Sequence, residues 1–474
     1  MDTLLSLTTA ELRKGFADGT LTPRHALDAT LAQLDAVNDE INAIVAVDRE
    51  RAIRAADDAG RRWAVGEPAS VLDGIPVTVK DSIRTVGLPW RHGTAPNAGL
   101  PDCDVDAPPA ARLKEAGAII VGKTAMPDFG MLASGVSSLY GLTRNPWDLA
   151  TSPGGSSSGA GASLAAGIGW GSVGSDIAGS VRLPAAHCGL VALKPTQGRI
   201  PHLPSSTVRS AGPMARTVTE VAELHSVISG PDPRDELSLP PEDFDPREDL
   251  LTRARIRGAR VGVLLDMGYG YRAVDEVADV VRRAAETLAA AGATVEQVPP
   301  PFEEDPYPAL DALFQVRART EFEAFDEHGR GRVLPELVAW SQGADLMSAT
   351  DLERAAAAVG RSRDRIARHL AGYDVVLAPV TPVVSFPAGS VGLDPDRPLA
   401  HCSYTCWFNQ TGQPAASLCF AMSGGRPVGV QVVGPRFADR SVLAVTRWLE
   451  ASRGFVPDWP LVPRRADAAV PVPA

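Results

Sequence analysis

The chain has 474 residues, of which 45% are hydrophobic and 22% charged, an ordinary composition for a globular enzyme that buries a large core. The formal net charge of −11, without a basic stripe interleaved with aromatic residues, argues against a nucleic-acid partner and against an anionic membrane surface. No stretch approaches 18 consecutive apolar residues, and the N-terminus lacks the pattern of a secretory signal.

Five cysteines in so long a chain indicate reduced thiols, not a disulfide framework, and favour a cytoplasmic location. Cys402 and Cys406 lie four residues apart, but no second Cys/His pair with zinc spacing accompanies them. Both are interpreted as small buried side chains. We therefore expect neither a metal nor a cofactor.

Helix signals dominate the first 60 residues. Thr8 and Glu11 form a capping box, and Thr22-Pro23 supplies a cap and a first-turn proline. After residue 70 strands and helices alternate, which predicts an α/β fold. In chain order the predicted elements are a strand at 75–79, a helix at 108–117, a strand at 118–124, a glycine-rich turn and helix at 156–168, a strand at 259–265, a helix at 274–292, a strand at 293–298, a helical section at 305–371 and a strand at 374–380.

The chain is predicted to form one large domain, because no clean linker separates two complete cores. One stretch is acidic and proline-rich, which is typical of a solvated surface connector. The predicted segments are an N-terminal helical segment packing on the core at 1–60, a catalytic core at 61–229, the surface connector at 230–258, the rest of the α/β domain with a helical substrate-pocket region at 259–460, and a loose C-terminal tail at 461–474.

Lys80 ends the predicted strand in GIPVTVKDSI, and the chain otherwise favours arginine, with 41 arginines and five lysines. A desolvated lysine can lose its proton, whereas an arginine in a protein cannot. The apolar strand before Lys80 would lower its pKa, and the neighbouring Asp81 would raise it. Lys80 is therefore a candidate base whose behaviour depends on where Asp81 points.

Three glycine-rich stretches are candidate functional loops. GWGSVG at 169–174 matches a dinucleotide-binding fingerprint, but the expected strand before it and helix after it are missing. GSSSG at 155–159, centred on Ser157, matches the nucleophile elbow of α/β-hydrolases, but turn-like residues precede it. GSDIAGSVRLPAAHCG at 174–189 places small residues before Ser180, where successive backbone amides can form an oxyanion hole.

Taken together, GGSSSGAG at 154–161 and GSDIAGSVRLPAAHCGLVALKPT at 174–196 resemble the signature of the amidase signature family. Ser156 and Ser180 are 24 residues apart, which is the family's spacing. The resemblance extends over residues 5–455 through LDGIPVTVKDSI, VGKTAMPDFG, GLTRNPWD, DVVLAPVTP and FNQTGQPAASLCFAMSGGRPVGVQVVG. It implies a single large α/β domain, in which helices cover both faces of a mixed, twisted sheet.

The resemblance also implies roles for individual residues. Ser180 matches the nucleophile, Ser156 the serine that the family holds in a cis peptide conformation, and Lys80 the base. Ser157 and the flanking Asp176 and Arg182 are interpreted as supporting residues. The oxyanion hole is matched by the backbone amides of Ile177, Ala178, Gly179 and Ser180.

Two departures from the family pattern alter the surroundings of these residues. Ile177-Ala178-Gly179 stands where the family often has Thr-Gly-Gly, so a hydroxyl is lost while the backbone amides remain. Ser158 replaces the usual glycine. The expected reaction is hydrolysis of an amide to an acid and ammonia or an amine. Ser180 attacks the carbonyl while its proton passes through Ser156 to neutral Lys80, which gives an acyl-enzyme.

Substrate choice is predicted to reside away from these three residues. The apolar bias of the flanking segments favours small aryl or aliphatic acyl amides, and esters, anilides, hydrazides and carbamates fit the same mechanism. The candidate pocket residues are small or apolar: Met126, Phe129, Met131, Gly154, Gly155, Trp340 and Trp407.

Other functions stay open at this point. Within the family the alternative is the A subunit of glutamyl-tRNA amidotransferase, which needs a partner protein. From other classes the alternatives are an α/β-hydrolase-type esterase using Ser157 with a histidine, and a non-catalytic nucleotide-binding protein using residues 169–174. The expected partner is a small-molecule amide, with neither nucleic acid nor membrane, and a homodimer stays open.

Overall fold

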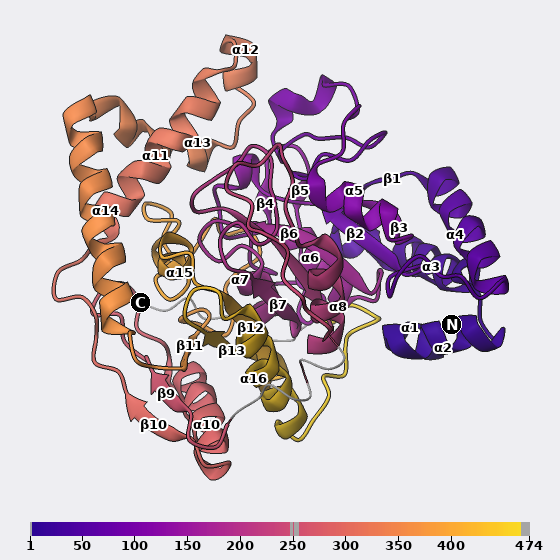
Figure 1. Ribbon diagram of the computed structural model, residues 1–474. Coiled ribbons are helices and arrows are strands. Elements are labelled where there is room, and N and C mark those ends of the chain that lie inside the picture. The colour runs from indigo at the N-terminus through magenta and orange to yellow at the C-terminus, as the bar shows by residue number, and fades with distance from the viewer. Residues whose placement is uncertain (1, 247–249, 251–255, 466–474) are drawn as a thin grey trace.

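The computed structural model describes residues 2–246, 250 and 256–465. An eleven-stranded mixed sheet forms its centre, with the strand order β1-β3-β2-β6-β8-β7-β12-β13-β11-β9-β10 (Figure 1). Strands β4 and β5 form a separate small hairpin. The strands are β1 (Ile44–Val47), β2 (Pro76–Lys80), β3 (Ile119–Thr124), β4 (Val136–Ser137), β5 (Gly141–Leu142), β6 (Gly171–Asp176), β7 (Val191–Lys194), β8 (Ser210–Ala215), β9 (Arg260–Val263), β10 (Thr294–Gln297), β11 (Val375–Pro379), β12 (Ala415–Ser423) and β13 (Arg426–Val433).

The helices begin where the capping signals predict them, with Thr8 capping α2 and Thr22 capping α3. The α-helices are α1 (Asp2–Leu5), α2 (Thr9–Asp18), α3 (Pro23–Ile41), α4 (Arg49–Ala64), α5 (Pro108–Glu115), α6 (Ser158–Ala165), α7 (Arg182–Cys188), α8 (Val218–Ile228), α10 (Asp275–Ala290), α11 (Tyr307–Glu323), α12 (Glu327–Arg330), α13 (Pro335–Ser341), α14 (Ala349–His369), α15 (Cys406–Gln410) and α16 (Asp439–Ser452).

The sheet is parallel where a helical crossover joins two strands. β2 pairs in parallel with β3 and β6, and β9 pairs in parallel with β10 and β11. The remaining pairs of the large sheet are antiparallel. Parallel neighbours need long crossovers, which α5, α6 and α10 help to provide. The predicted mixed α/β sheet is confirmed.

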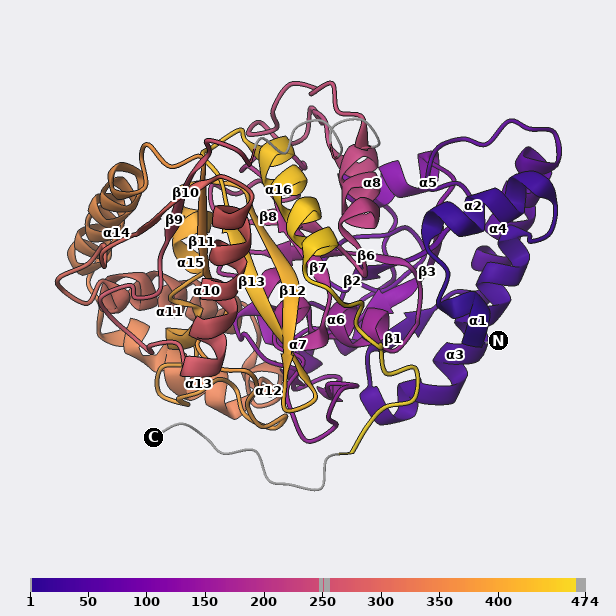
Figure 2. The same cartoon turned by 90° about the horizontal axis from the view of Figure 1, so that it is seen from below.

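Helices cover both faces of the sheet. Figure 2 shows α8, α16 and α10 side by side over one face, and α6 and α7 pack on the other. The amphipathic α10 turns Val277, Val281 and Leu288 into the core against the sheet. Because both faces are covered, the central strands β2, β6 and β11 are buried along their whole length.

A helical layer stands beside the sheet and is the predicted helical section. Helices α11, α13 and α14 pack on one another there (Figure 1). Their apolar side chains join a second core cluster that reaches the loop before Ser180 through Ala178. This layer therefore borders the segment where the sequence predicts an oxyanion hole.

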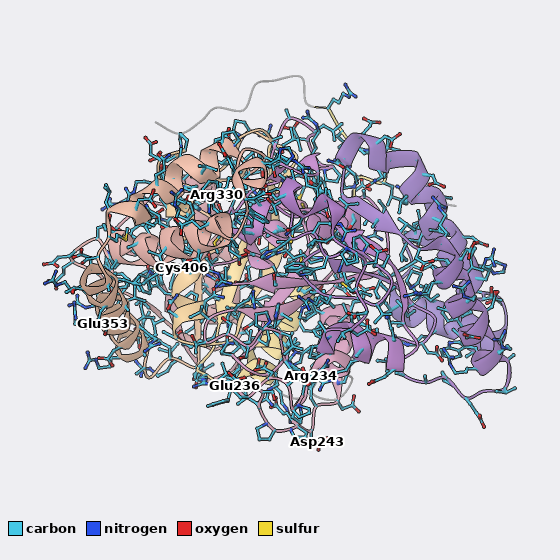
Figure 3. All side chains as sticks on the ribbon, turned by 90° about the horizontal axis from the view of Figure 1, so that it is seen from above. Arg234, Glu236, Asp243, Arg330, Glu353 and Cys406 are labelled. Atoms are coloured by element: carbon cyan, nitrogen blue, oxygen red, sulfur yellow. The ribbon has the colours of Figure 1, made fainter. Side chains whose placement is uncertain are left out.

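The predicted segments differ from the structure in three details. The N-terminal segment contributes the edge strand β1 as well as helices. Within the connector, Arg234 and Glu236 lie at one edge of the molecule (Figure 3), but Ile256 is buried in the main core. In the tail, residues 461–465 lie against the loop at 146–149 through backbone bonds of Arg464, and the rest of the tail falls outside the described residues. None of the described helices is long and apolar enough to cross a membrane.

Candidate active site

Two neighbouring parallel strands bring Lys80 to the loop at 177–181, the signature loop, which carries Ser180. β2 and β6 pair with Val79 opposite Val173, so Lys80 leaves the sheet beside Gly174 and Ser175. Both strands end at the same edge, and open α/β sheets bind their ligands outside the carboxyl ends of their strands. The register of β2 and β6 therefore places Lys80 at the edge of the sheet where ligands bind.

Lys80 is fully buried and hydrogen-bonded to two serines. Its Nζ donates to Ser156 Oγ at 2.8 Å and to Ser175 Oγ at 3.1 Å. Burial lowers the pKa of Lys80 to about 7. The nearby carboxylate of Asp176 opposes this effect, and the positive charge of Arg209 adds to it. A substantial fraction of Lys80 is therefore neutral near neutral pH.

Asp81 points away from the lysine that precedes it. Its two carboxylate oxygens accept hydrogen bonds from the backbone amides of Arg91 at 2.9 Å and Gly93 at 2.8 Å. The carboxylate thus anchors the following loop and forms no ion pair with Lys80 among the described residues. Asp81 still raises the pKa of Lys80, but less than burial lowers it.

The loop before α6 joins Ser156 to the Ser180 segment. The peptide bond between Gly155 and Ser156 is cis. The Ser157 amide donates to the Ser180 carbonyl at 3.1 Å, and the Ser157 hydroxyl donates to the Ser175 carbonyl at 3.3 Å. Ser157 therefore links both loops through hydrogen bonds.

A buried ion pair holds the turn that carries Ser180. Arg182 donates to both carboxylate oxygens of Asp176, at 3.0 and 2.9 Å, and neither side chain is exposed. Burial alone would raise the pKa of Asp176, but Arg182 and the Asn409 amide hold it well below its usual range. Asp176 is thus a permanent anion that accepts backbone amides of the turn.

One of the four expected oxyanion-hole amides is already occupied. The Gly179 amide donates to Asp176 Oδ1 at 2.7 Å, so it does not point toward a substrate in this structure. Among the described residues, the amides of Ile177, Ala178 and Ser180 donate to no protein group. Three amides therefore remain for an oxyanion, and the expectation for Gly179 is corrected.

The role of Gly179 is steric. Its φ of +129° lies in the region that side chains rarely adopt, and an added Cβ would lie 2.4 Å from Thr405 Oγ1. Thr405 in turn donates its hydroxyl to the Ala178 carbonyl. The glycine thus permits Thr405 to approach the turn closely.

Four supporting residues were not singled out from the sequence. Asn409 donates to Asp176 Oδ1 at 2.9 Å and accepts from Arg182 at 2.6 Å. Asn409 lies in the FNQTGQ match and Ser175 in the signature itself. The motifs therefore contained both residues, but they did not indicate what either residue does. Besides Asn409 and Ser175, these residues are Thr405 and Gln431, which accept hydrogen bonds from the Arg182 guanidinium.

The predicted pocket residues separate into three groups. Met126 lies near the site, because a Cβ on Gly130 would touch both Met126 Cε at 3.2 Å and Ser156 Oγ at 3.4 Å. Phe129 and Met131 are buried in the cluster that also contains Ala178. Met126 therefore lies close to Ser156, and Phe129 and Met131 belong to the adjoining apolar core.

The two predicted tryptophans are core residues instead. Trp407 is fully buried and donates to the Tyr269 hydroxyl at 2.7 Å. Trp340 donates to the Asp311 carboxylate at 3.1 Å. Neither lines the cavities described below.

The predicted pocket glycines allow the loop before α6 to pack closely against its neighbours. A Cβ on Gly154 would meet His187 at 2.9 Å, and one on Gly155 would meet the Ser134 carbonyl at 2.3 Å. Both positions therefore face protein atoms that already fill the space around the loop.

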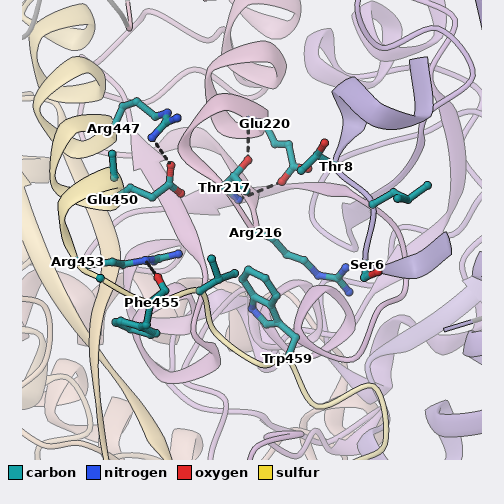
Figure 4. A pocket seen from close by; sticks show the side chains of 14 residues that line it. Ser6, Thr8, Arg216, Thr217, Glu220, Arg447, Glu450, Arg453, Phe455 and Trp459 are labelled. Carbon is teal, nitrogen blue, oxygen red and sulfur yellow. Dashed lines mark hydrogen bonds and ion pairs between the residues drawn. The ribbon is translucent and has the colours of Figure 1, made fainter. Parts of the chain in front are cut away.

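A cavity of about 320 Å³ adjoins the signature loop. Ile177 of the loop lines it on one side, and Phe314 of α11 and Val359 of α14 line it on the other. A cavity of about 560 Å³ lies elsewhere, around Arg216, Glu220 and Trp459 (Figure 4). Neither cavity is lined by Lys80, Ser156 or Ser180, but the smaller one reaches the expected oxyanion segment through Ile177, whereas the larger one has no such link.

The two competing glycine motifs do not form the geometries they would need. In GWGSVG, Gly171 and Gly174 lie within β6, in the middle of the sheet, whereas a dinucleotide fingerprint requires a strand-to-helix turn. Ser157 begins α6 without a preceding strand, and its buried hydroxyl is used by the Ser175 carbonyl. Both alternatives therefore lack a site.

The five cysteines are free, and all but Cys103 are buried. No disulfide joins them, as the sequence predicts. Burial raises the pKa of the Cys406 thiol to about 12, which keeps it protonated. The four buried thiols are packing groups.

Comparison with known proteins identifies the family. The Amidase profile matches residues 25–443. The chain is 34% identical to the A subunit of the glutamyl-tRNA(Gln) amidotransferase of Salinispora arenicola (strain CNS-205), over 96% of this chain and 99% of that protein. It is 33% identical to an acylamidase of Rhodococcus erythropolis, over 94% of this chain and 95% of that protein.

The fold agrees with this assignment. A bacterial aryl acylamidase of the amidase signature family, 24% identical, superposes with a TM-score of 0.88 and covers 96% of this chain and 98% of its own. The chain therefore belongs to the amidase signature family and is a hydrolase of carbon–nitrogen amide bonds.

Proposed function

We propose that this amidase hydrolyses amides of small aryl or aliphatic acids through Ser180, Ser156 and Lys80. The observation that carries the proposal is the hydrogen bond of 2.8 Å between buried Lys80 Nζ and Ser156 Oγ. A serine hydroxyl is a weak nucleophile until a base removes its proton. Lys80, with its pKa lowered to about 7, has a neutral form that meets this requirement near neutral pH.

In the proposed cycle, Ser180 Oγ forms a bond to the carbonyl carbon of the amide. Its proton moves to Ser156, and the Ser156 proton moves to neutral Lys80. The carbonyl oxygen becomes an oxyanion that accepts hydrogen bonds from the free amides of Ile177, Ala178 and Ser180.

Collapse of this intermediate breaks the carbon–nitrogen bond and leaves an ester on Ser180. The proton returns from Lys80 through Ser156 to the departing nitrogen. A water molecule then attacks the ester carbon and gives a proton through Ser156 to Lys80. The bond between the carbon and Ser180 Oγ breaks, the proton returns from Lys80 through Ser156 to Ser180, and the acid leaves. In each half-reaction Lys80 must therefore both accept and return a proton.

The apolar surroundings of the site support small aryl or aliphatic acyl groups. Met126 lies beside Ser156, and Ile177 replaces the family's more polar residue. The acylamidase among the relatives agrees with such a substrate. Esters, anilides, hydrazides and carbamates would enter the same cycle because each joins a carbonyl carbon to an oxygen or nitrogen leaving group.

A second candidate is the A subunit of glutamyl-tRNA amidotransferase, because a relative 34% identical over 96% of the chain carries that name. Such a protein works with a partner and delivers ammonia for a second reaction. The purified chain alone separates the candidates: steady amide hydrolysis without ATP or a partner supports the acylamidase function. Turnover of glutamine only in the presence of a partner protein would favour the amidotransferase.

The proposed nucleophile is tested with a fluorophosphonate probe. Labelling followed by peptide mapping should find the adduct on Ser180, and Ser180→Ala should remain unlabelled. Ser157→Ala is the matched control, since it removes a neighbouring hydroxyl of the same loop and should keep the label. An adduct on Ser157, or full labelling of Ser180→Ala, would reject the proposed nucleophile.

A further inference from the structure

The cavity beside the signature loop combines apolar walls with positive charge. Its apolar wall is formed mainly by Leu310, Leu313, Phe314 and Val359 on α11 and α14, with Val208 and Ile177 opposite. The charged side chains that line it are Arg317 and Arg363, and no acidic residue lines it. Small-molecule sites are typically apolar with a few polar groups that fix the ligand's orientation.

Arg317 is held in this cavity without a partner. It is half-buried on α11, and no described residue forms a hydrogen bond or an ion pair with its guanidinium. Arg319, two residues later on the same helix, pairs with Glu323 at 3.2 Å and Asp345 at 2.7 Å. The Arg317 guanidinium therefore keeps donors free for a ligand in the cavity, whereas Arg319 already pairs with protein carboxylates.

A second arginine adds positive charge next to the cavity. Arg209 follows the cavity residues Thr207 and Val208, and its Nε is buried without a hydrogen-bond partner among the described residues. Burial lowers the pKa of Arg209 to about 10, and repulsion by Arg317 contributes. Arg209 in turn lowers the pKa of Lys80, so its charge reaches the proposed base.

Glu321 is the acid nearest to both arginines. It lies one turn after Arg317 on α11, and both arginines lower its pKa while burial raises it by more. It forms no ion pair with either among the described residues. Two arginines thus face one carboxylate, which leaves net positive charge at this end of the cavity.

We propose that the amide substrate carries a carboxylate that binds Arg317, with an apolar segment between this carboxylate and the scissile carbonyl. The inference rests on the proposed amidase function and adds the class of substrate. The planar guanidinium matches a carboxylate in two parallel hydrogen bonds. Leu310, Leu313 and Phe314 contact the apolar segment, and Ile177 joins the cavity to the oxyanion loop.

The carboxylate could belong to the acyl group or to the amine, and two substrate series distinguish these cases. The first compares the 4-nitroanilides of hexanoic acid and of adipic acid, which differ by a carboxylate on the acyl chain. The second compares hexanoyl anilide with 4-(hexanoylamino)benzoate, which differ by a carboxylate on the amine. In at least one series the anionic amide should have the higher kcat/KM.

Arg317→Met should lower kcat/KM for the preferred anionic amide by roughly 10- to 100-fold, the range of a charge-assisted hydrogen bond. The neutral partner amide should change by less than about threefold, since it makes no bond to the guanidinium. Arg317→Lys should recover part of the loss because it keeps the charge. Arg319→Met is the matched control on the same helix and should leave both values unchanged.

Salt provides a measurement that needs no variant. The advantage of the anionic amide should decrease as ionic strength rises, while the neutral amide keeps its kcat/KM. If the wild type hydrolyses the neutral amides and shows no anionic preference in either series, the inference is wrong and the amidase function stands. An anionic preference that Arg317→Met retains would also overturn it. Failure of Ser180→Ala to abolish hydrolysis would instead reject the proposed catalytic mechanism.

Discussion

Replacing Lys80 with arginine keeps a positive charge and removes the capacity to take up a proton. Lys80 is fully buried, its Nζ lies 2.8 Å from Ser156 Oγ, and its pKa is lowered to about 7. Activities are therefore compared above about pH 8, where more of the wild-type Lys80 is neutral. A positioned base contributes about 10²- to 10⁴-fold. Lys80→Arg should lower kcat/KM by that factor, or about 3–5 kcal/mol.

The assay is hydrolysis of a neutral anilide at saturating and limiting concentrations, together with the rate of fluorophosphonate labelling. Lys80→Met should lose as much activity as Lys80→Arg, since neither side chain can accept the proton. Lys123→Met is the matched control: Lys123 is also fully buried with its pKa lowered to about 8, but it donates to the Ile83 carbonyl and contacts neither serine. It should lose stability yet keep its kcat/KM per folded molecule.

A specific result would refute this reasoning. If folded Lys80→Arg stays within about tenfold of the wild type (~1.4 kcal/mol), Lys80 acts through its charge and not as a base. The proton would then have to leave Ser180 by another route. Circular dichroism of each variant ensures that loss of activity is not loss of fold.

Three further predictions concern pH, the buried ion pair and the turn. Only neutral Lys80 accepts a proton, and its pKa is lowered to about 7. The value of kcat/KM should therefore fall about tenfold per pH unit below that pKa and level off above it. A flat pH profile would contradict the role of Lys80 as the base. Arg182→Met leaves the Asp176 carboxylate buried without its partner and should lower the free energy of unfolding in urea by about 3–5 kcal/mol. The control Arg24→Met removes an exposed ion pair and should change that free energy little. Equal effects of the two substitutions would contradict the special cost of the buried pair. Gly179→Ala places a Cβ 2.4 Å from Thr405 Oγ1 and should lower the free energy of unfolding by about 1–3 kcal/mol and remove most of the activity. The control Gly66→Ala has a φ of +77° and open space around it, so it measures the backbone contribution without a clash. An equal loss of stability in the two variants would exclude the clash as the cause.

The sequence by itself determined the local structure around the site. The alternation before Lys80 predicts β2, the small residues after Ser157 predict α6, and capping residues mark the starts of α2 and α3. These features depend on neighbours within one turn or one strand, so they can be predicted from composition and period. The signature also identified Ser156 and Ser180 as a pair.

Only the tertiary structure decided how these pieces meet. The parallel register of β2 and β6 brings Lys80 to Ser156, which lies 76 residues further along the chain. The direction of Asp81 depends on the backbone amides of a loop ten residues away, and the loss of the Gly179 amide depends on how Asp176 folds back on its own turn. Such contacts follow from packing, which local periodicity does not contain.

Long-range packing also explains why the sequence-based predictions for the substrate pocket differ from the structure. Trp340 and Trp407 are as apolar as pocket residues, but each donates its indole N–H to a buried partner and packs in the core. Arg317 resembles any other arginine of a surface helix until α11, α14 and the signature loop enclose it. The sequence by itself determined the family and the catalytic residues to test; the tertiary structure decided which side chains line the cavity, because long-range packing alone fixes which groups are left without a partner.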